Sequence, residues 1–261
     1  MSPPVPALGN AVMAVFRLSW MRQIRGKKLR LALISVALVL VAVVAVRYLV
    51  ESADPRNVMR EAVSWGYFTL LVYLVPFLFT SGSVAEEVEA RTFTYLASRP
   101  VGRLAITMGK YLAGCGMAIA VLAASILLMH IAVFLTEPTP MIDALPDTLR
   151  QIGAITLLAL VYGAVCMFWG AVAPEAAGII SVLYLGIVEF AASGAPLQVR
   201  LVSMNYHAQH LAGMPKAGLM PDTVPDIPVW ASVIVVSAVA MGFLFLAVTV
   251  VRASEYRVGT A

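Results

Sequence analysis

Charge is scarce in this chain. Charged residues make up 12% of its 261 positions and apolar residues 61%, whereas a soluble domain carries about 25% charged and 45–50% apolar residues. The composition therefore argues against a soluble globular protein and for an integral membrane protein. The apolar residues form long runs, and they do not alternate with polar residues as they would in a transmembrane barrel. The sequence thus predicts an all-α integral membrane protein.

Cysteine is nearly absent as well, and this bears on metal sites. The two cysteines, Cys115 and Cys166, lie inside apolar runs as small hydrophobic residues, so no disulfide framework or thiolate metal site is expected. His207 and His210 have the i, i+3 spacing of two ligands on one helix, but no nearby acid completes a set, so no metal is expected. No basic stripe is interleaved with aromatic residues, so no nucleic-acid partner is expected either.

The apolar runs are long enough to cross a membrane, which takes about 20 mostly apolar residues. Residues 29–251 are expected to form one domain of six transmembrane helices, with no soluble domain between them. The predicted spans are Leu29–Val50, Trp65–Val84, Leu104–Leu135, Leu149–Ala173, Ala176–Ser193 and Val229–Val251.

Lysine and arginine are divided unevenly by these spans. Six spans place both termini on one side, which holds twelve of the 18 basic residues. Because basic residues favour cytoplasmic segments, we expect both termini in the cytoplasm and the chain in the cell inner membrane. The twelve are Arg17, Arg22, Arg25, Lys27, Lys28, Arg30, Arg91, Arg99, Arg103, Lys110, Arg252 and Arg257.

Three segments lie outside the spans or between them. The first 28 residues are expected to form an amphipathic helix in the membrane interface, because Met13, Phe16, Trp20 and Ile24 share one face and basic residues another. Residues 194–228 form the largest outer loop, which five prolines break, although a short re-entrant or interfacial helix is suggested over Leu197–Leu211. Residues 252–261 are expected to form a cytoplasmic tail.

One stretch, AEEVEARTFTYLASRPVGRLAITMGK (Ala85–Lys110), concentrates charge between two apolar runs. Its acids cluster at the start of a predicted helix, where Arg91 follows Glu87 at the favourable i+4 spacing. Arg99 precedes Pro100 and should end that helix, because a residue before proline avoids α geometry. We therefore expect a helix, a sharp break and then the third span, all beginning on the cytoplasmic face.

Two interpretations of this stretch are open from its residues alone. It could be a charged cap that keeps a loop soluble and anchors the membrane boundary. Thr92, Phe93 and Tyr95, however, add bulk that solubility does not require, and such a surface suits docking to a partner protein.

The same stretch resembles the cytoplasmic loop of ABC-2 type transporter permeases. In that family an acidic helix follows the second span, and a Ser/Thr-Arg-Pro turn then leads to a Gly-Lys pair in the third span. Arg91 stands where glycine is common, and the six-span layout and the N-terminal amphipathic helix are similar too. The matching positions are Glu86, Glu87, Glu89, Arg91, Thr92, Leu96, Ser98, Arg99, Pro100, Val101, Arg103, Gly109 and Lys110.

The resemblance implies a permease subunit that has no ATPase of its own. The chain contains no G-x-x-x-x-G-K-[ST] pattern, so ATP and Mg are expected on a separate ABC ATPase, present in two copies, and no cofactor on this chain. The resemblance makes the loop at 85–103 the coupling helix that seats in this ATPase, with Phe93 among its contacts. Arg103, Gly109 and Lys110 would carry the motion into the third span, and a second copy or a related permease would complete the pathway.

Two further acids are candidates for a cavity or a subunit interface. Glu189 lies near the outer end of the fifth span, where an intramembrane acid is costly and suggests a function. A structural role at the interface and a role with cargo or protons both stay open. Glu175 lies in the tight turn between spans four and five, where it could contact the ATPase or favour a helix start.

The predicted function is ATP-driven movement of an unidentified substrate across the inner membrane, with export expected. The alternative is an ATP-driven mechanical or structural anchor, which would act on an envelope partner through residues 194–228 and move no cargo. The lipid bilayer is a partner in either case.

Overall fold

The structure, a computed structural model, describes residues 7–50, 54–82, 102–194, 197–214 and 227–253. These residues contain helices and no strand, and six of the helical segments are long and apolar enough to cross a membrane. The predicted all-α class and the number of spans are therefore confirmed.

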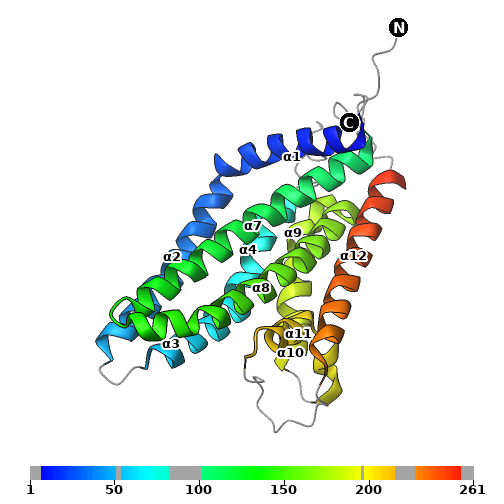
Figure 1. The fold of residues 1–261 in the computed structure, drawn as a ribbon. Helices are drawn as coiled ribbons and strands as arrows, with labels where there is room; N and C mark the ends of the chain where they lie inside the picture. Colours follow the sequence, from blue (N-terminus) through cyan, green and yellow to red (C-terminus); the bar gives the residue numbers. More distant parts are fainter. Residues whose placement is uncertain (1–6, 51–53, 83–101, 195–196, 215–226, 254–261) are drawn as a thin grey trace.

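The helices follow one another as in Figure 1, and several spans combine α-helix with short 3-10 or π segments. The second span joins α3, η1 and α4, and the fifth joins η2, α9, η3 and α10. The elements are α1 (Leu8–Ile24), α2 (Lys27–Leu49), α3 (Pro55–Glu61), η1 (Ala62–Leu71), α4 (Val72–Thr80), α7 (Arg103–Phe134), α8 (Pro138–Val172), η2 (Pro174–Ala176), α9 (Ala177–Leu183), η3 (Tyr184–Glu189), α10 (Phe190–Gly194), η4 (Leu197–Val202), α11 (Met204–Leu211) and α12 (Val229–Ala253).

Two spans begin earlier than their apolar runs predict. The second starts at Pro55 and not near Trp65, and the fourth starts at Pro138 and not near Leu149. A proline fits the first turn of a helix because its missing N–H would have no intrahelical partner there. The added turns carry charge, which is why a search for apolar runs leaves them out.

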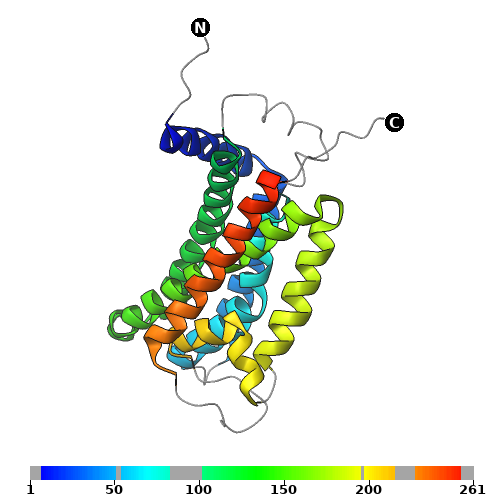
Figure 2. The ribbon, with the colours of Figure 1, turned by 90° about the vertical axis from the view of Figure 1, so that its right-hand side faces the viewer.

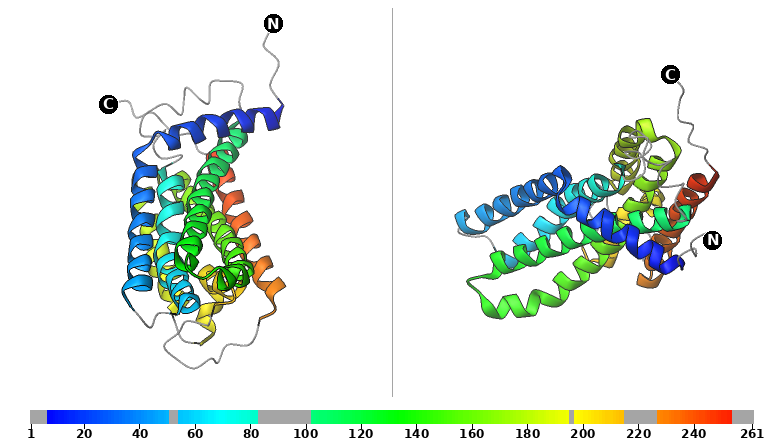
Figure 3. Two further views of the ribbon diagram at one scale, coloured as in Figure 1. Left: turned by 60° about the vertical axis from the view of Figure 1, so that its left-hand side comes forward. Right: turned by 90° about the horizontal axis from the view of Figure 1, so that it is seen from above.

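The N-terminal helix α1 is separate from the first span. The backbone breaks at Gly26, where an added Cβ would lie 3.3 Å from the carbonyl oxygens of Arg22 and Gln23. Helix α1 then lies across one end of the bundle, while α2 runs along it (Figure 3). A helix separate from the first span is therefore present, and its position in the membrane interface stays a prediction.

The face that α1 buries differs from the predicted one. Ala11 and Val15 are its buried residues, whereas Met13 and Ile24 are about half exposed, at 51% and 50%. The prediction grouped large apolar residues by their angle around the helix. The structure instead buries small residues, because α1 approaches α7 closely.

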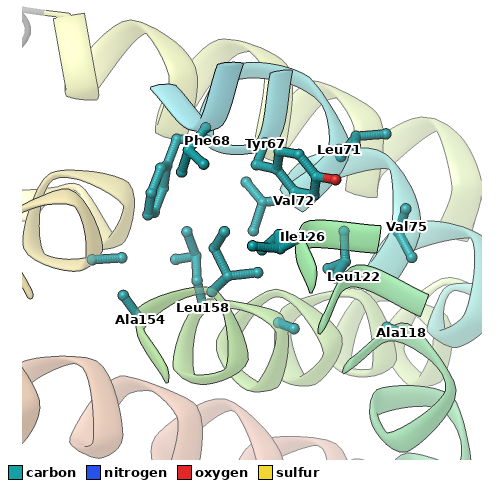
Figure 4. Close-up of a cluster of buried hydrophobic side chains, with 14 of the residues drawn as sticks. Tyr67, Phe68, Leu71, Val72, Val75, Ala118, Leu122, Ile126, Ala154 and Leu158 are labelled. Atoms are coloured by element: carbon teal, nitrogen blue, oxygen red, sulfur yellow. The ribbon is translucent and has the colours of Figure 1, made fainter. Parts of the chain in front are cut away.

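The centre of the bundle lies between the second, third and fourth spans. Figure 4 shows Tyr67 and Phe68 of η1 with Leu122 and Ile126 of α7 and Leu158 of α8, all fully buried or nearly so. The hydroxyl of Tyr67 donates to Ser125 Oγ at 3.0 Å, which satisfies a polar group inside the apolar core.

The remaining spans lie at the periphery. In the most apolar part of each helix, buried residues make up 56% of α7 and 61% of α8. The corresponding shares are 22% for the first span, 22% for the fifth and 17% for the sixth. Figure 2 shows α12 and the fifth span on the outside of the bundle, with α11 between them at the end away from α1. The three peripheral spans therefore present apolar faces to lipid or to other subunits.

Candidate functional site

Most residues of the predicted coupling helix lie outside the described residues. These are Glu86, Glu87, Glu89, Arg91, Thr92, Phe93, Leu96, Arg99 and Pro100. The structure does place the start of the third span, where the resemblance assigns the residues that carry motion into the membrane. That start is α7, and its first turns hold Arg103, Gly109 and Lys110.

Arg103 joins the start of α7 to the end of α12. Its Nη1 donates to the carbonyl oxygen of Arg252 at 2.9 Å and to that of Val251 at 3.2 Å. The last carbonyls of a helix have no intrahelical donor and carry partial negative charge, so a guanidinium is a favourable cap. The third and sixth spans, far apart in sequence, are thus linked at the end of the bundle where α1 lies.

Gly109 is a point of close contact between α7 and α1. A Cβ added at Gly109 would lie 2.7 Å from Val15 Cβ and 2.8 Å from the carbonyl oxygen of Val12. Two turns further along α7, an added Cβ at Gly116 would lie 3.0 Å from the Trp20 ring. Glycine is therefore required at position 109 for the two helices to pack, and α1 lies along the same helix that Arg103 begins.

Lys110 is buried, with 5% of its surface exposed. An ammonium at this depth needs polar partners, because removing it from water is costly. The next residue, Tyr111, donates to the carbonyl oxygen of Leu160 at 2.9 Å and so links α7 to α8. Arg103 and Gly109 therefore connect α7 to its neighbours, and Lys110 lies buried in the bundle rather than on its surface.

Glu189 is the centre of a buried polar cluster at the opposite end of the bundle. Only 3% of its surface is exposed, and its Oε2 accepts from Tyr162 Oη at 3.1 Å and from Ser203 Oγ at 3.0 Å. The backbone N–H of Met204 also donates to this oxygen at 3.0 Å, and that of Asn205 at 3.5 Å. Such a set of donors stabilises the ionised carboxylate.

The two backbone donors identify what the carboxylate does. Met204 and Asn205 form the first turn of α11, whose N–H groups have no intrahelical acceptor. Glu189 therefore caps α11 from another helix, with its negative charge at the positive end of the helix dipole. This geometry favours the structural interpretation of Glu189.

Asn205 extends the cluster to the second span. Its Nδ2 donates to the carbonyl oxygen of Phe68 at 3.0 Å and to Tyr73 Oη at 2.7 Å. The π-helical η1 ends here, with the N–H of Val72 bonded to the carbonyl of Tyr67. Where the backbone hydrogen bonds change from the five-residue spacing of a π-helix to the four-residue spacing of an α-helix, one carbonyl is left without an intrahelical donor. Here the Phe68 carbonyl receives its donor from α11.

The far end of α11 is held by a residue that sequence analysis did not select. Arg150 Nε donates to the carbonyl oxygen of Leu211, the last residue of the helix, at 2.5 Å. The chain then turns through Gly213, whose φ of 69° is a left-handed conformation that favours glycine. The signals available in the sequence were Ser203, which starts a helix as an N-cap, and a glycine two residues after Leu211.

The outer-loop helix expected over 197–211 is thus two segments. The 3-10 turn η4 ends at Val202, and α11 begins after Ser203, whose Oγ accepts from the N–H of Tyr206 at 3.4 Å. Helix α11 is largely buried and packs against η1, α8, α10 and α12. It is therefore part of the bundle.

His207 forms hydrogen bonds within the bundle. Its Nδ1 pairs with Ser232 Oγ at 3.0 Å and its Nε2 with the carbonyl oxygen of Leu201 at 3.0 Å, so both ring nitrogens are engaged. Burial lowers the pKa of His207 below its ordinary value, which favours the neutral ring. Across the described part of the chain, His210 and the other His, Cys, Asp and Glu residues also form no group that could hold a metal ion.

Glu175 lies apart from these contacts. It is exposed in the 3-10 turn η2, between α8 and α9, at the end of the fifth span opposite Glu189. The tight turn predicted between the fourth and fifth spans is therefore present. The structure does not bring the two acids into one cavity.

The chain thus combines six spans, a separate N-terminal helix packed on the third span, and an inward-folded outer segment. The model of the ABC-2 family transporter proteins matches residues 22–191, which is more than half of the sequence. The chain belongs to the ABC-2 transporter family. A comparison with curated proteins gives no match.

Membership of this family defines the coarse role. An ABC-2 transporter protein is the membrane component of an ABC transporter and pairs with an ABC ATPase subunit. The chain is therefore a multi-pass membrane permease. The family match covers the first five spans, so Arg103, Gly109, Lys110 and Glu189 lie inside it, whereas α11 and α12 lie beyond it.

Proposed function

We propose that this permease moves a substrate out of the cell across the inner membrane, driven by ATP hydrolysis on two copies of a separate ABC ATPase that hold the ATP and Mg. The observation that carries the proposal is the set of contacts at the start of α7. Arg103 holds the end of α12, and Gly109 holds α1. A displacement of the segment before α7 would therefore reach three helices at once.

The ATPase would dock on the loop that precedes α7. Glu86, Glu87, Glu89 and Arg91 supply charge for such a contact in the sequence, and Pro100 separates them from the third span. The excess of basic residues on this side supports a cytoplasmic location for the loop and both termini, where they could meet the ATPase. Two permease subunits, either two copies of this chain or this chain and a relative, would form the pathway.

The alternative is a mechanical anchor that uses the outer segment to hold an envelope partner. Polar groups of residues 197–214 form hydrogen bonds to the bundle itself, with Glu189, Arg150 and Ser232 as partners. A segment folded inward in this way presents little surface to a partner. We therefore favour transport.

The test separates docking from transmission. The permease is co-expressed with the ABC ATPase encoded beside it, and assembly and ATPase activity are measured in proteoliposomes. The variant with Glu86, Glu87 and Arg91 replaced by alanine should lose the ATPase on purification. Arg103→Gln should retain the ATPase but lower the stimulated activity several-fold, because the link to α12 is lost.

Arg30→Gln is the matched control, since Arg30 is an exposed base on the first span. It should leave both assembly and activity unchanged. The docking assignment is wrong if the triple variant assembles and stimulates hydrolysis as the parent protein does.

A further inference from the structure

A small polar cavity lies at the end of the bundle opposite α1. It has a volume of about 160 Å³ and is lined mainly by residues of α3 and of the first turns of α8; these two helices are labelled in Figure 1. These are the charged turns that extend the second and fourth spans beyond their apolar runs. The cavity is separate from the Glu189 cluster and from the contacts of α7 with α1 and α12, and the proposed transport function does not use it.

Charged residues form two pairs of opposite sign across the mouth of the cavity. Arg56 and Asp143 make the first pair, with Nη2 and Oδ2 3.4 Å apart. One helical turn further along, Arg60 on α3 and Asp147 on α8 line the same cavity. Within the described part of the chain, no ion pair or hydrogen bond joins Arg60 or Asp147 to another residue.

The inner wall of the cavity carries an acceptor that lacks a donor. Gln151, one turn after Asp147, is 7% exposed, and among the described residues its Oε1 has no hydrogen-bond partner. The neighbouring Thr148 cannot supply a donor, because its hydroxyl is engaged with His130 Nδ1 at 2.9 Å and with the carbonyl of Ala144 at 3.1 Å. A buried acceptor left without a donor is costly, so a bound group is expected to provide one.

The size and charges of the cavity define that group. A cavity of about 150 Å³ can hold a ring of six heavy atoms, so this one has room for a compact organic ion. The two unpaired charges that line the cavity, Arg60 and Asp147, have opposite sign, and Gln151 Oε1 requires a hydrogen-bond donor. We propose that the cavity binds a small zwitterion, with its oxyanion on Arg60 and its primary ammonium on Asp147 and Gln151 Oε1.

Ions of a single charge fit the cavity less well. A lone cation would face Arg60 and a lone anion would face Asp147, and each like-charge approach offsets the attraction of the opposite partner. Phosphoethanolamine has the required groups. It could come from the head group of a membrane phospholipid or from free solute, and both sources present a primary ammonium and a phosphate, which is a diester in the lipid and a monoester in the free solute.

Binding is measured on the purified full-length protein in nanodiscs, which contain only phosphatidylcholine in the first arm. In the first arm, free phosphoethanolamine is titrated by calorimetry against phosphocholine, whose quaternary ammonium has no N–H to donate. In the second arm, phosphatidylethanolamine and phosphatidylcholine with identical acyl chains are compared by native mass spectrometry. We expect a preference for the primary ammonium of about tenfold or more in at least one arm, and that arm identifies the source.

The variants Arg60→Gln, Asp147→Asn and Gln151→Leu should each weaken this binding about tenfold or more. Glu61→Gln is the matched control, because Glu61 is exposed on α3 and does not line the cavity. The melting temperature of each variant shows that the fold is retained, and Arg60 and Asp147 are exposed enough to be replaced without loss of packing. The proposal is overturned if neither arm prefers the primary ammonium, or if the Arg60 and Asp147 variants bind as the parent does, since the cavity then holds water only.

Discussion

Glu189 and Arg150 hold opposite ends of the same short helix, α11. The Glu189 carboxylate accepts two backbone N–H groups from the first turn, and Arg150 donates to the carbonyl of the last residue. Each charge lies at the end of the helix dipole that it stabilises. A helix of eight residues is marginal by itself in water, so these two residues, from the fifth and fourth spans, determine where α11 lies.

Loss of the Glu189 charge should loosen the N-terminal end of α11. Glu189→Gln keeps one acceptor oxygen and should cost about 1–2 kcal/mol, whereas Glu189→Leu leaves the donors of Met204 and Ser203 buried without an acceptor and should cost about 3 kcal/mol or more. The melting temperatures of the purified variants give the order of their stabilities. Glu175→Gln, at the exposed end of the same span, is the control and should have little effect. If the Glu189→Leu variant were as stable as the parent protein, the cluster would not be structural.

Arg150→Gln should release the C-terminal end of α11. Arg150 is partly accessible to solvent, so the loss is expected to be smaller, about 0.5–1 kcal/mol. Hydrogen exchange is the more sensitive measurement, because it reports local opening. Residues 204–214 should exchange faster in Arg150→Gln and in Glu189→Gln, with α7 unchanged in both. Acceleration confined to one of the two variants would mean that the two caps act independently.

A side chain at position 109 should separate α1 from α7. Gly109→Ala places a methyl group 2.7 Å from Val15 Cβ and 2.8 Å from a backbone oxygen, so α1 must shift. Such overpacking typically costs about 1–3 kcal/mol. Gly153→Ala is the matched control, since nothing lies within 4 Å of an added Cβ there and a helical alanine gains about 0.5–1 kcal/mol over glycine. The melting temperature should therefore fall in Gly109→Ala and rise in Gly153→Ala. An unchanged melting temperature in Gly109→Ala would contradict the close packing.

Acid should destabilise the region around His207. Burial lowers its folded pKa below the ordinary value of 6.5, so the unfolded state binds the proton more readily. The stabilising contribution of the neutral ring is present above pH 6.5 and is lost as the pH falls below that value. Hydrogen exchange of residues 204–211 should increase between about pH 7 and pH 5 in the parent protein. His207→Asn should show a smaller pH dependence, and an unchanged pH dependence would assign the effect to another group.

Much of the fold could be predicted because the relevant signals are local. Runs of apolar residues gave the six spans, and the amphipathic pattern of the first 28 residues separated an N-terminal helix from the first of them. The limits of two spans were misjudged because Pro55–Glu61 and the start of α8 are helical but charged. Their charges lie across a cavity from one another, for example in the Arg56–Asp143 pair, and this compensation appears only when the two helices are placed.

The site was predicted in part for the same reason. Glu189 was selected because a carboxyl group inside a span is costly wherever it lies. Its partners could not be named, since Tyr162 and Ser203 come from different elements and carry no local signal. Arg150 was not selected from the sequence. Gly109 was assigned through the family resemblance, and the structure supplies the physical reason in the contact with Val15.

The sequence by itself determined that this chain is a six-span helical membrane protein of the ABC-2 type, because hydrophobic run length, charge distribution and one loop motif are properties of neighbouring residues. Only the tertiary structure decided that Arg103 joins α7 to α12, that α11 folds inward between Glu189 and Arg150, and that α1 buries Ala11 and Val15. These contacts join residues up to 149 positions apart, and their free energy depends on distance and burial, which no local pattern contains.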